Sequence, residues 1–217
     1  MFYFLCRFVK TLLKKQYSIS IVTADETNLI KKIFEFRYNL YCEEYKLLNK
    51  DEYLDEIETD EFDKNSVFFI AKDYQNNIVG LVRLISSSNC IFPTSEEFNL
   101  QEVVLDLCAE GNEIVEVSRF MVLPQYKKTL LMIDLCRAIY IYSIENEVSF
   151  WVGCVENWFL KTLQTIYPVA VVGEPKFCFN AMNYAFIIKL IDLRKHLKNK
   201  NYFIYMALSR KSKKFKF

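Results

Sequence analysis

The pentapeptide EVSRF, residues 116–120, places Glu116 and Arg119 inside a run of apolar residues that is typical of a buried β-strand. Removing an ionised side chain from water costs several kcal/mol, so both residues need partners. In a regular strand their side chains would point to opposite faces, whereas a β-bulge between them would turn both toward one cleft. A carboxylate and a guanidinium that share a cleft could bind a small polar molecule and accept a proton from it.

Other charged residues offer the partners. Arg83 interrupts the strand-like VGLVRLIS, Arg37 lies in FEFRYNLY, and Asp60 and Asp63 lie in TDEFD. We expect these side chains to converge on EVSRF. The same pattern also fits an edge strand with a surface ion pair, or a buried network that only holds the fold together.

The composition disfavours several kinds of chemistry. The single histidine, His196, lies in the basic RKHLKNK, where we expect a solvated helix face. Hydrolases that pair a histidine with a serine or cysteine are therefore disfavoured, because their general base must touch a nucleophile inside a pocket. With four glycines, the sequence has no Walker loop and no dinucleotide fingerprint, so chemistry on nucleotide phosphates is also unexpected.

The cysteines are widely separated and show neither a CxxC motif nor a metal-ligand spacing. We expect no metal site and interpret the cysteines as buried, reduced thiols of a cytoplasmic protein. They are Cys6, Cys42, Cys90, Cys108, Cys136, Cys154 and Cys178.

Charge and hydropathy vary along the chain although the formal net charge is only +1. Residues 51–63 hold eight acids and no base, whereas residues 194–217 hold nine bases and no acid. The N-terminal MFYFLCRFVKTLLKK is interrupted by Arg7, is too short to span a bilayer and lacks a signal-peptide cleavage pattern. It is predicted to form an amphipathic surface helix.

Hydrophobic periodicity predicts strands that alternate with helices, without a repeat or a low-complexity linker. Asp25 is a plausible N-cap of the first helix, and the Asn-rich turn at 75–77 indicates a hairpin. The expected strands are 17–24, 66–73, 78–86, 112–122, 149–155, 169–174 and 185–192. The expected helices are 25–48, about 100–108, 129–146 and 156–167, with an irregular region around Pro93. A single α/β domain with a mixed, twisted sheet flanked by helices accounts for this order.

Four segments, taken in order, resemble the acyl-homoserine lactone synthase superfamily. They are FRYNLYCEE (36–44), ETDEFD (58–63), GLVRL (80–84) and EVSRFMV (116–122). This superfamily includes quorum-signal synthases, long-chain N-acyl amino acid synthases and exosortase-associated acyltransferases. The resemblance implies a GNAT-like fold over residues 1–217, with a basic tail at about 209–217. It also implies transfer of a fatty acyl group from an acyl carrier protein, or less often coenzyme A, to an amine.

The resemblance also implies roles for particular residues. Glu116 is expected to be the general base, with Ser118 and Arg119 beside it in the catalytic group. Each arginine could contact the substrate or only orient the acids. The expected substrate-binding residues are Arg37, Tyr41, Asp60, Asp63, Arg83 and Phe120.

The acceptor is predicted to be an amino acid or a related small amine. Tyr41 stands where the lactone synthases usually have Phe, and the tryptophan that helps them hold S-adenosylmethionine is missing between these motifs. Both tryptophans, Trp151 and Trp158, come later in the chain. Acyl-homoserine lactone synthesis from S-adenosylmethionine therefore stays as the alternative.

The turn after the EVSRF strand bears on the acyl donor. In coenzyme A-dependent GNAT enzymes this turn resembles Q/R-x-x-G-x-G/A. Its backbone amides bind pyrophosphate at a helix N-terminus. LPQYKKTLLMID (123–134) has no glycine, which favours an acyl carrier protein as partner. Lys127 and Lys128 could contact its acidic surface, or simply be solvated.

Other hypotheses remain open. The chain could be a non-catalytic GNAT-like binding module, or its basic C-terminal tail at 209–217 could act on nucleic acid or on an anionic membrane. No specific nucleic acid is expected, and a binder of that kind would show steep salt dependence. No permanently bound cofactor is expected, since the acyl donor is a substrate. We expect the aromatic residues clustered in FWVGCVENWFL and FCFNAMNYAF to be mostly core, and some could line an acyl tunnel.

Overall fold

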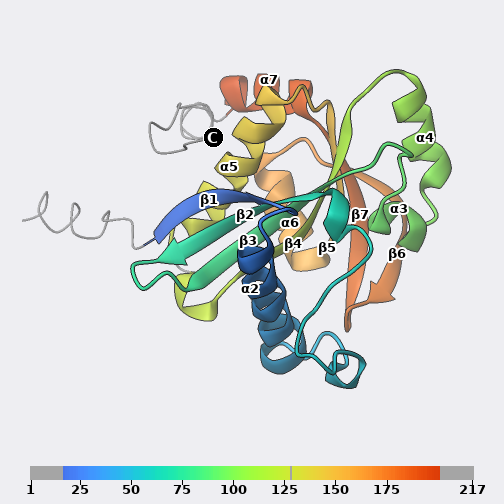
Figure 1. The fold of residues 1–217 in the computed structure, drawn as a ribbon. Coiled ribbons are helices and arrows are strands. Elements are labelled where there is room, and N and C mark those ends of the chain that lie inside the picture. Colours follow the sequence, from blue (N-terminus) through green and yellow to red (C-terminus); the bar gives the residue numbers. More distant parts are fainter. Residues whose placement is uncertain (1–16, 128, 201–217) are drawn as a thin grey trace, which may run out of the picture.

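The computed structural model describes residues 17–127 and 129–200, and its strands form one seven-stranded sheet in this part of the chain (Figure 1). The strand order is β1-β2-β3-β4-β5-β7-β6. The strands are β1 (Tyr17–Thr23), β2 (Ser66–Asp73), β3 (Ile78–Ser86), β4 (Ile114–Val122), β5 (Phe150–Glu156), β6 (Ala170–Cys178) and β7 (Ala181–Lys189). The α-helices are α2 (Thr27–Tyr38), α3 (Pro93–Glu97), α4 (Gln101–Ala109), α5 (Leu131–Glu145), α6 (Asn157–Ile166) and α7 (Leu190–Lys200).

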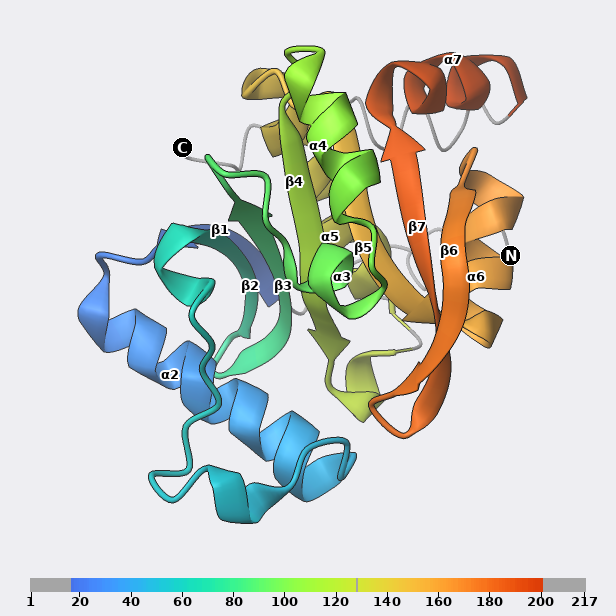
Figure 2. The ribbon, with the colours of Figure 1, turned by 90° about the vertical axis from the view of Figure 1, so that its right-hand side faces the viewer.

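The sheet is mixed, as expected, and its single parallel pair lies in the middle. Strands β4 and β5 pair in parallel at three positions, the last of which joins Glu116 to Val152. Beyond that position the two strands separate, whereas the remaining neighbours are antiparallel along most of their lengths. The predicted divergence of the EVSRF strand from the strand near 149–155 is therefore present (Figure 2).

Helices cover both faces of the sheet because successive strand residues point to opposite sides. Phe69 in β2 packs in a core with α5, α6 and α7, and its neighbours Phe68 and Ile70 pack on the opposite face with Ile33 of α2. On that second face α3 and α4 cover β5 and neighbouring strands through Phe92 and other apolar residues (Figure 2). The charged residues of the sequence motifs lie on the face of α2 and α3.

The structure confirms most predicted elements and corrects the first helix. Helix α2 ends at Tyr38 and continues as a π-helix from Asn39 to Glu44, so the predicted helix over 25–48 is too long. Asp25 is not its N-cap, because its carboxylate accepts the hydroxyl of Thr23 instead. The region expected to be irregular around Pro93 contains α3, which has the proline in its first turn. The last predicted strand also ends earlier, and residues 190–192 begin α7.

A β-bulge is present in β4, and it lies at Arg119 and Phe120, slightly later than the predicted position between Glu116 and Arg119. Leu81 of β3 pairs with Met121 and Arg83 pairs with Ser118, so β4 has one more residue than β3 between these pairs. Arg119 has a φ of 50°, the left-handed conformation that side chains rarely adopt. As a result Ser118 and Met121, which are three residues apart, both lie on the face covered by α2.

The prediction of only reduced thiols is wrong for one pair. Cys90 and Cys108 form a disulfide between the loop after β3 and helix α4, with their Cα atoms 6.7 Å apart. The sequence spacing gave no sign of this pair because the chain folds back through α3 before the two residues meet. Among the described cysteines, the free thiols are Cys42, Cys136, Cys154 and Cys178.

Three predicted features lie outside the described residues. These are the N-terminal amphipathic helix, Lys128 and the basic tail at about 209–217. No helix in the described ranges is long and apolar enough to cross a membrane.

Candidate active site

Arg37, in the last turn of α2, lies at the base of a buried charged cluster. Its side chain is fully buried, and its Nε donates to Glu58 Oε2. Its Nη1 donates to Asp63 Oδ1 at 2.5 Å. Helix α2 therefore positions a cation against the acidic segment that precedes β2, as the sequence pattern predicted.

Arg83 connects the same acids to the central strands. Its Nη1 lies 2.6 Å from both Asp60 Oδ1 and Asp63 Oδ1, and its Nε donates to Ser118 Oγ at 2.9 Å. The Arg83 side chain is fully buried. Among the described residues Ser118 thus contacts an arginine and not Glu116, so its geometry fits a role in orienting Arg83.

Arg119 contacts the cluster from the β4 bulge. Its Nη2 donates to Glu58 Oε1 at 2.8 Å and to Asp60 Oδ2 at 3.0 Å, and its guanidinium lies 5.4 Å from the centre of the Tyr41 ring. The side chains of Arg119 and Asp60 are 16% and 23% exposed, whereas the other charged side chains of the cluster are at least 92% buried. Arg119 and Asp60 are therefore the members that an acceptor in solution could reach.

Glu58 is a site residue that the sequence reasoning missed. It bridges Arg37 and Arg119, and with it the cluster contains three arginines and three acids. Burial alone would raise the pKa of Glu58, but the hydrogen bond and charge of Arg37 and the charge of Arg119 outweigh burial and lower it. Glu58 precedes Asp60 by two residues in ETDEFD, but spacing in an irregular segment does not show which acids point inward.

Glu116 lies on the same face of the sheet but has a different partner. Its Oε2 accepts the backbone N–H of Thr94, at the start of α3, at 2.8 Å. The side chain is buried, and burial raises the pKa of Glu116 to about 7, against the Thr94 bonds and the positive charges of Arg83 and Arg119. A carboxyl group with this pKa can take up and release a proton near neutral pH.

Of the remaining predicted residues, Tyr41 contacts this cluster, whereas Phe120 packs with the core on the opposite face of the sheet. Tyr41 lies in the π-helix, an irregularity often found at functional sites. The ring of Phe120 is 6.3 Å from that of Phe159 in α6, and exposed Lys127 places its Nζ 4.7 Å from the centre of the Tyr45 ring. Tyr45 in turn approaches the carbonyl of Val122 at the end of β4.

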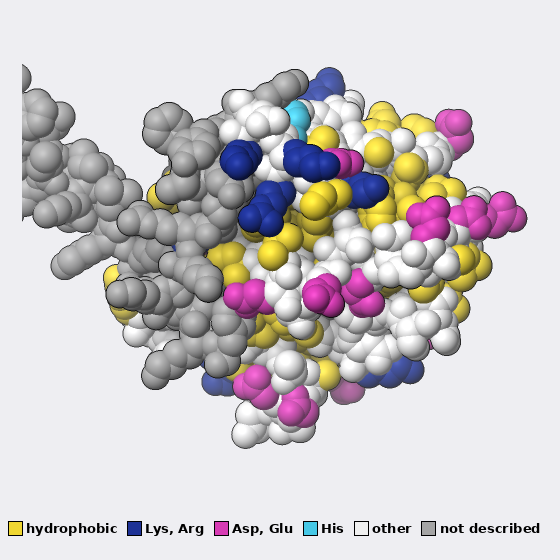
Figure 3. Space-filling model, turned by 90° about the horizontal axis from the view of Figure 1, so that it is seen from above, with side chains coloured by type: hydrophobic (Ala, Val, Ile, Leu, Met, Phe, Trp, Pro, Cys, Tyr) yellow, Lys and Arg dark blue, Asp and Glu magenta, His cyan; other side chains and the backbone are white. Residues whose placement is uncertain are grey.

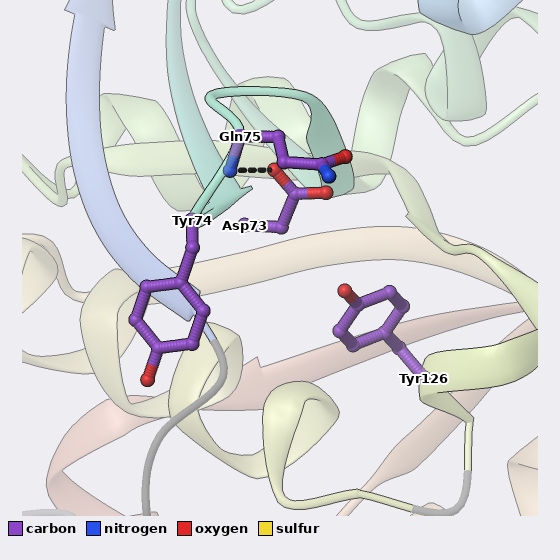
Figure 4. A pocket seen from close by; sticks show the side chains of 4 residues that line it. All are labelled: Asp73, Tyr74, Gln75 and Tyr126. Atoms are coloured by element: carbon purple, nitrogen blue, oxygen red, sulfur yellow. Dashed lines mark hydrogen bonds between the residues drawn. The ribbon is translucent and has the colours of Figure 1, made fainter.

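A hollow elsewhere on the surface is less suited to chemistry. It is lined by Asp73, Tyr74, Gln75 and Tyr126, at the β2–β3 turn and the short helix after β4 (Figure 4). The carboxylate of Asp73 accepts the N–H groups of Gln75 and Asn77, which closes the turn. The acid of this hollow is thus used within its own turn.

Comparisons with known proteins agree with this geometry. Residues 36–137 match the family model described as an acetyltransferase (GNAT) domain, and no curated protein sequence matches the chain. One similar solved structure is BjaI, a CoA-dependent acyl-homoserine lactone synthase with SAM and isopentyl-CoA. It shares 21% identity with a TM-score of 0.61, over 84% of this chain and 90% of BjaI.

Two further structures belong to the two branches that the sequence resembles. The acyl-homoserine lactone synthase LasI is 17% identical, with a TM-score of 0.60, over 80% of this chain and 89% of LasI. FeeM, an N-acyl amino acid synthase from uncultured soil microbes, is 12% identical, with a TM-score of 0.59, over 82% of this chain and 93% of FeeM. At such identities the likeness establishes the fold.

The domain matched by residues 36–137 and the similar solved structures agree on a GNAT-like fold for this chain, in which β4 and β5 diverge. Its structure is close to those of the acyl-homoserine lactone synthases and of an N-acyl amino acid synthase. The predicted GNAT-like fold is thereby confirmed, and the domain match supports the predicted acyltransferase class.

Proposed function

We propose that this protein transfers a fatty acyl group from an acyl carrier protein thioester to the amine of an amino acid or a related small amine. The observation that carries the proposal is the pairing of two groups at the open side of the cluster. Asp60 offers a carboxylate and Arg119 a guanidinium, 3.0 Å apart at their contacting atoms. An amino acid presents the complementary charges, an ammonium and a carboxylate, within one small molecule.

Glu116 is the proposed general base. An ammonium has no lone pair, so the acceptor must lose a proton before it attacks the thioester carbonyl. Glu116 lies where β4 and β5 part and carries a carboxyl group whose pKa is about 7. The neutral amine would then form the amide bond, the C–S bond would break, and the carrier's thiol would leave with a proton.

The contacts of the two tryptophans support an amino acid over S-adenosylmethionine as the acceptor. The indole of Trp151 lies in the core and donates to Ser143 Oγ at 2.8 Å, and Trp158 is 64% exposed on α6, where it donates to Glu156. Both indole N–H groups are therefore bonded to residues other than Asp60 and Arg119. Lactone synthesis from S-adenosylmethionine remains the alternative, since BjaI and LasI share the fold.

The start of α5 supports a carrier protein as the donor. A diphosphate would need free amides at this helix N-terminus, but the amides of Lys127, Thr129 and Leu131 donate to oxygens within the loop. Asp134 in the first turn adds a negative charge, and it accepts the hydroxyl of Tyr17 at 2.7 Å. A phosphopantetheine arm on a carrier protein needs no diphosphate site.

A competition assay tests both halves of the proposal. Purified protein would receive one fatty acyl chain either on an acyl carrier protein or on coenzyme A, together with an amino acid mixture and methionine-labelled S-adenosylmethionine. We expect N-acyl amino acids by mass spectrometry, formed faster from the carrier-bound chain and absent with Glu116→Gln. Labelled acyl-homoserine lactone without N-acyl amino acids would contradict the proposed acceptor. Turnover with acyl-coenzyme A but not with the carrier-bound chain would contradict the proposed donor.

A further inference from the structure

A disulfide closes the segment that touches the proposed base. The Cys90–Cys108 bond encloses all of α3 and most of α4, which lie over β4 and β5 on the face of the charged cluster (Figure 2). Both cysteines are half-buried at the edge of the core that includes Phe92. The segment inside the loop also supplies the N–H that binds Glu116.

Hydrogen bonds connect the disulfide to that contact. Gln101 donates from Nε2 to the carbonyl oxygen of Cys90 at 2.9 Å, and its Oε1 accepts the hydroxyl of Ser95 at 3.0 Å. Ser95 directly follows Thr94, whose N–H lies 2.8 Å from Glu116 Oε2. The hydrogen bonds of Gln101 and Ser95 therefore link Cys90 to the segment that binds Glu116, and the disulfide keeps these side chains together.

We propose that the Cys90–Cys108 disulfide gives acyl transfer a thiol-redox control, in which the closed bond holds Thr94 against Glu116 and reduction releases it. This inference rests on the proposed function of Glu116. A dithiol is the reductant: two electrons and two protons pass to the two cysteines, which become thiols, and the dithiol becomes a cyclic disulfide. Thr94 then acts as a positioning residue for the base.

The expected effect follows from what faces Glu116. The groups are Thr94 from α3, Arg83 from β3, and Arg119 from β4, with the Cys154 thiol from β5 also nearby. An N–H that donates to a carboxylate favours its charged form, so loss of Thr94 raises the pKa of Glu116. A rise of about one unit from about 7 lowers the carboxylate fraction at pH 7 from about one half to about one tenth, which reduces the rate about fivefold.

The test compares the oxidised and the dithiothreitol-reduced full-length protein, each assayed across pH. We expect reduction to lower kcat/KM at pH 7 about fivefold and to move the apparent pKa of the rate upward. The variant with both Cys90→Ser and Cys108→Ser should match the reduced protein and ignore dithiothreitol. Cys178→Ser, which removes a half-buried free thiol elsewhere, should keep the full response.

Three results would overturn the inference. Cys90 and Cys108 could be found as free thiols in the oxidised protein by alkylation and mass mapping. The pH profile could be the same in both redox states while Glu116→Gln abolishes turnover, which would leave the proposed function intact. The third result concerns hydrogen exchange, which needs no turnover: if reduction does not accelerate exchange of the Thr94 amide, the disulfide does not hold that contact. If no substrate is turned over, only the proposed function fails.

Discussion

Glu116 is held between burial, which favours its neutral form, and three neighbours that favour its charge. The neutral form is favoured below about pH 7 in the folded protein, whereas an exposed glutamate ionises near 4.5. Ionisation of the native state therefore costs free energy that the unfolded chain does not pay. The same group that suits proton transfer near neutral pH also makes the fold less stable as it ionises.

Glu116→Gln separates these two effects. We expect turnover to fall about 100-fold or more, because general-base catalysis contributes about 10²–10⁴. The free energy of unfolding should rise relative to the wild type above pH 7, by up to roughly 3 kcal/mol, and differ little below pH 4.5. Urea unfolding at pH 4 and pH 8 measures the difference. A variant that loses stability at both pH values would indicate a structural role.

The charge of Glu58 has the opposite effect on stability from the charge of Glu116. Its pKa is lowered in the native state, so its charge stabilises the fold above the unfolded pKa near 4.5, and this contribution is lost as the pH falls through the folded pKa. Glu58→Gln leaves Arg37 and Arg119 without their shared carboxylate and should cost about 3–5 kcal/mol at pH 7. Its destabilisation should shrink in acid.

Glu61→Gln is the matched control for Glu58. It removes an exposed carboxylate from the same acidic segment, so its effect on urea unfolding should stay within about 0.5 kcal/mol. Equal effects of the two substitutions would contradict the bridging role of Glu58.

At the scale of elements, the β4 bulge was predictable from residues and the contacts across the fold were not. A glutamate and an arginine three apart in an apolar strand require an irregularity if both are to find partners, and the bulge with Arg119 in the left-handed region supplies it. The hairpin of β2 and β3 was likewise readable from alternation and an Asn-rich turn.

What the sequence left out depends on chain segments that meet only in three dimensions. Thr94 reaches Glu116 through a five-residue helix too short to show periodicity, and Cys90 reaches Cys108 by the same turn of the chain. Glu58 was hidden because an irregular acidic segment does not reveal which of its acids point inward. The π-helix after α2 keeps the apolar pattern of an α-helix, so its wider turn left no mark in the sequence.

Gly153 in β5 permits the close approach of the strands where they part. A Cβ atom there would lie 2.8 Å from the carbonyl oxygen of Val117 in β4 and 3.0 Å from the Phe186 ring. Because a backbone oxygen cannot move aside alone, Gly153→Ala should force the strands apart and lower the free energy of unfolding by about 1–3 kcal/mol.

Gly80→Ala is the control variant for Gly153→Ala, and thermal unfolding and turnover assays compare the two. Its Cβ would meet only the ends of Leu131 and Leu135, at 3.1 and 3.2 Å, and these side chains can shift. We expect a smaller loss of stability than for Gly153→Ala, with near-normal turnover. A larger effect at Gly80 would show that the approach of β4 and β5 is not the tighter constraint.

On the scale of the whole molecule, two of the regions that carry exposed basic side chains lie far apart. Arg194, Lys195 and Lys198 are exposed on α7, and Figure 3 shows basic side chains gathered on that face. Helix α7 lies at the opposite end of the sheet from the end of β4, which is followed by Lys127 (Figure 2). The two regions can therefore be tested separately for binding of an acidic carrier protein.

Lys127→Glu should weaken the use of the carrier-bound donor. A charge at the rim of an interface alters association and its salt dependence, so we expect KM for the acyl carrier protein substrate to rise about twofold to fivefold, with kcat little changed. Lys198→Glu on α7 should leave KM unchanged. If the two variants raise KM equally, net charge and not a docking surface explains the effect.

The short parallel pairing of β4 and β5 divides the sheet mechanically. Strands β1 to β4 form one antiparallel ribbon and β5 to β7 another, joined in the sheet by only three residue pairs. Such a seam permits each ribbon to open as a separate cooperative unit, so native-state hydrogen exchange should resolve two opening free energies instead of one. A stretching force applied across the sheet should likewise rupture the molecule first along this line, and leave both ribbons folded.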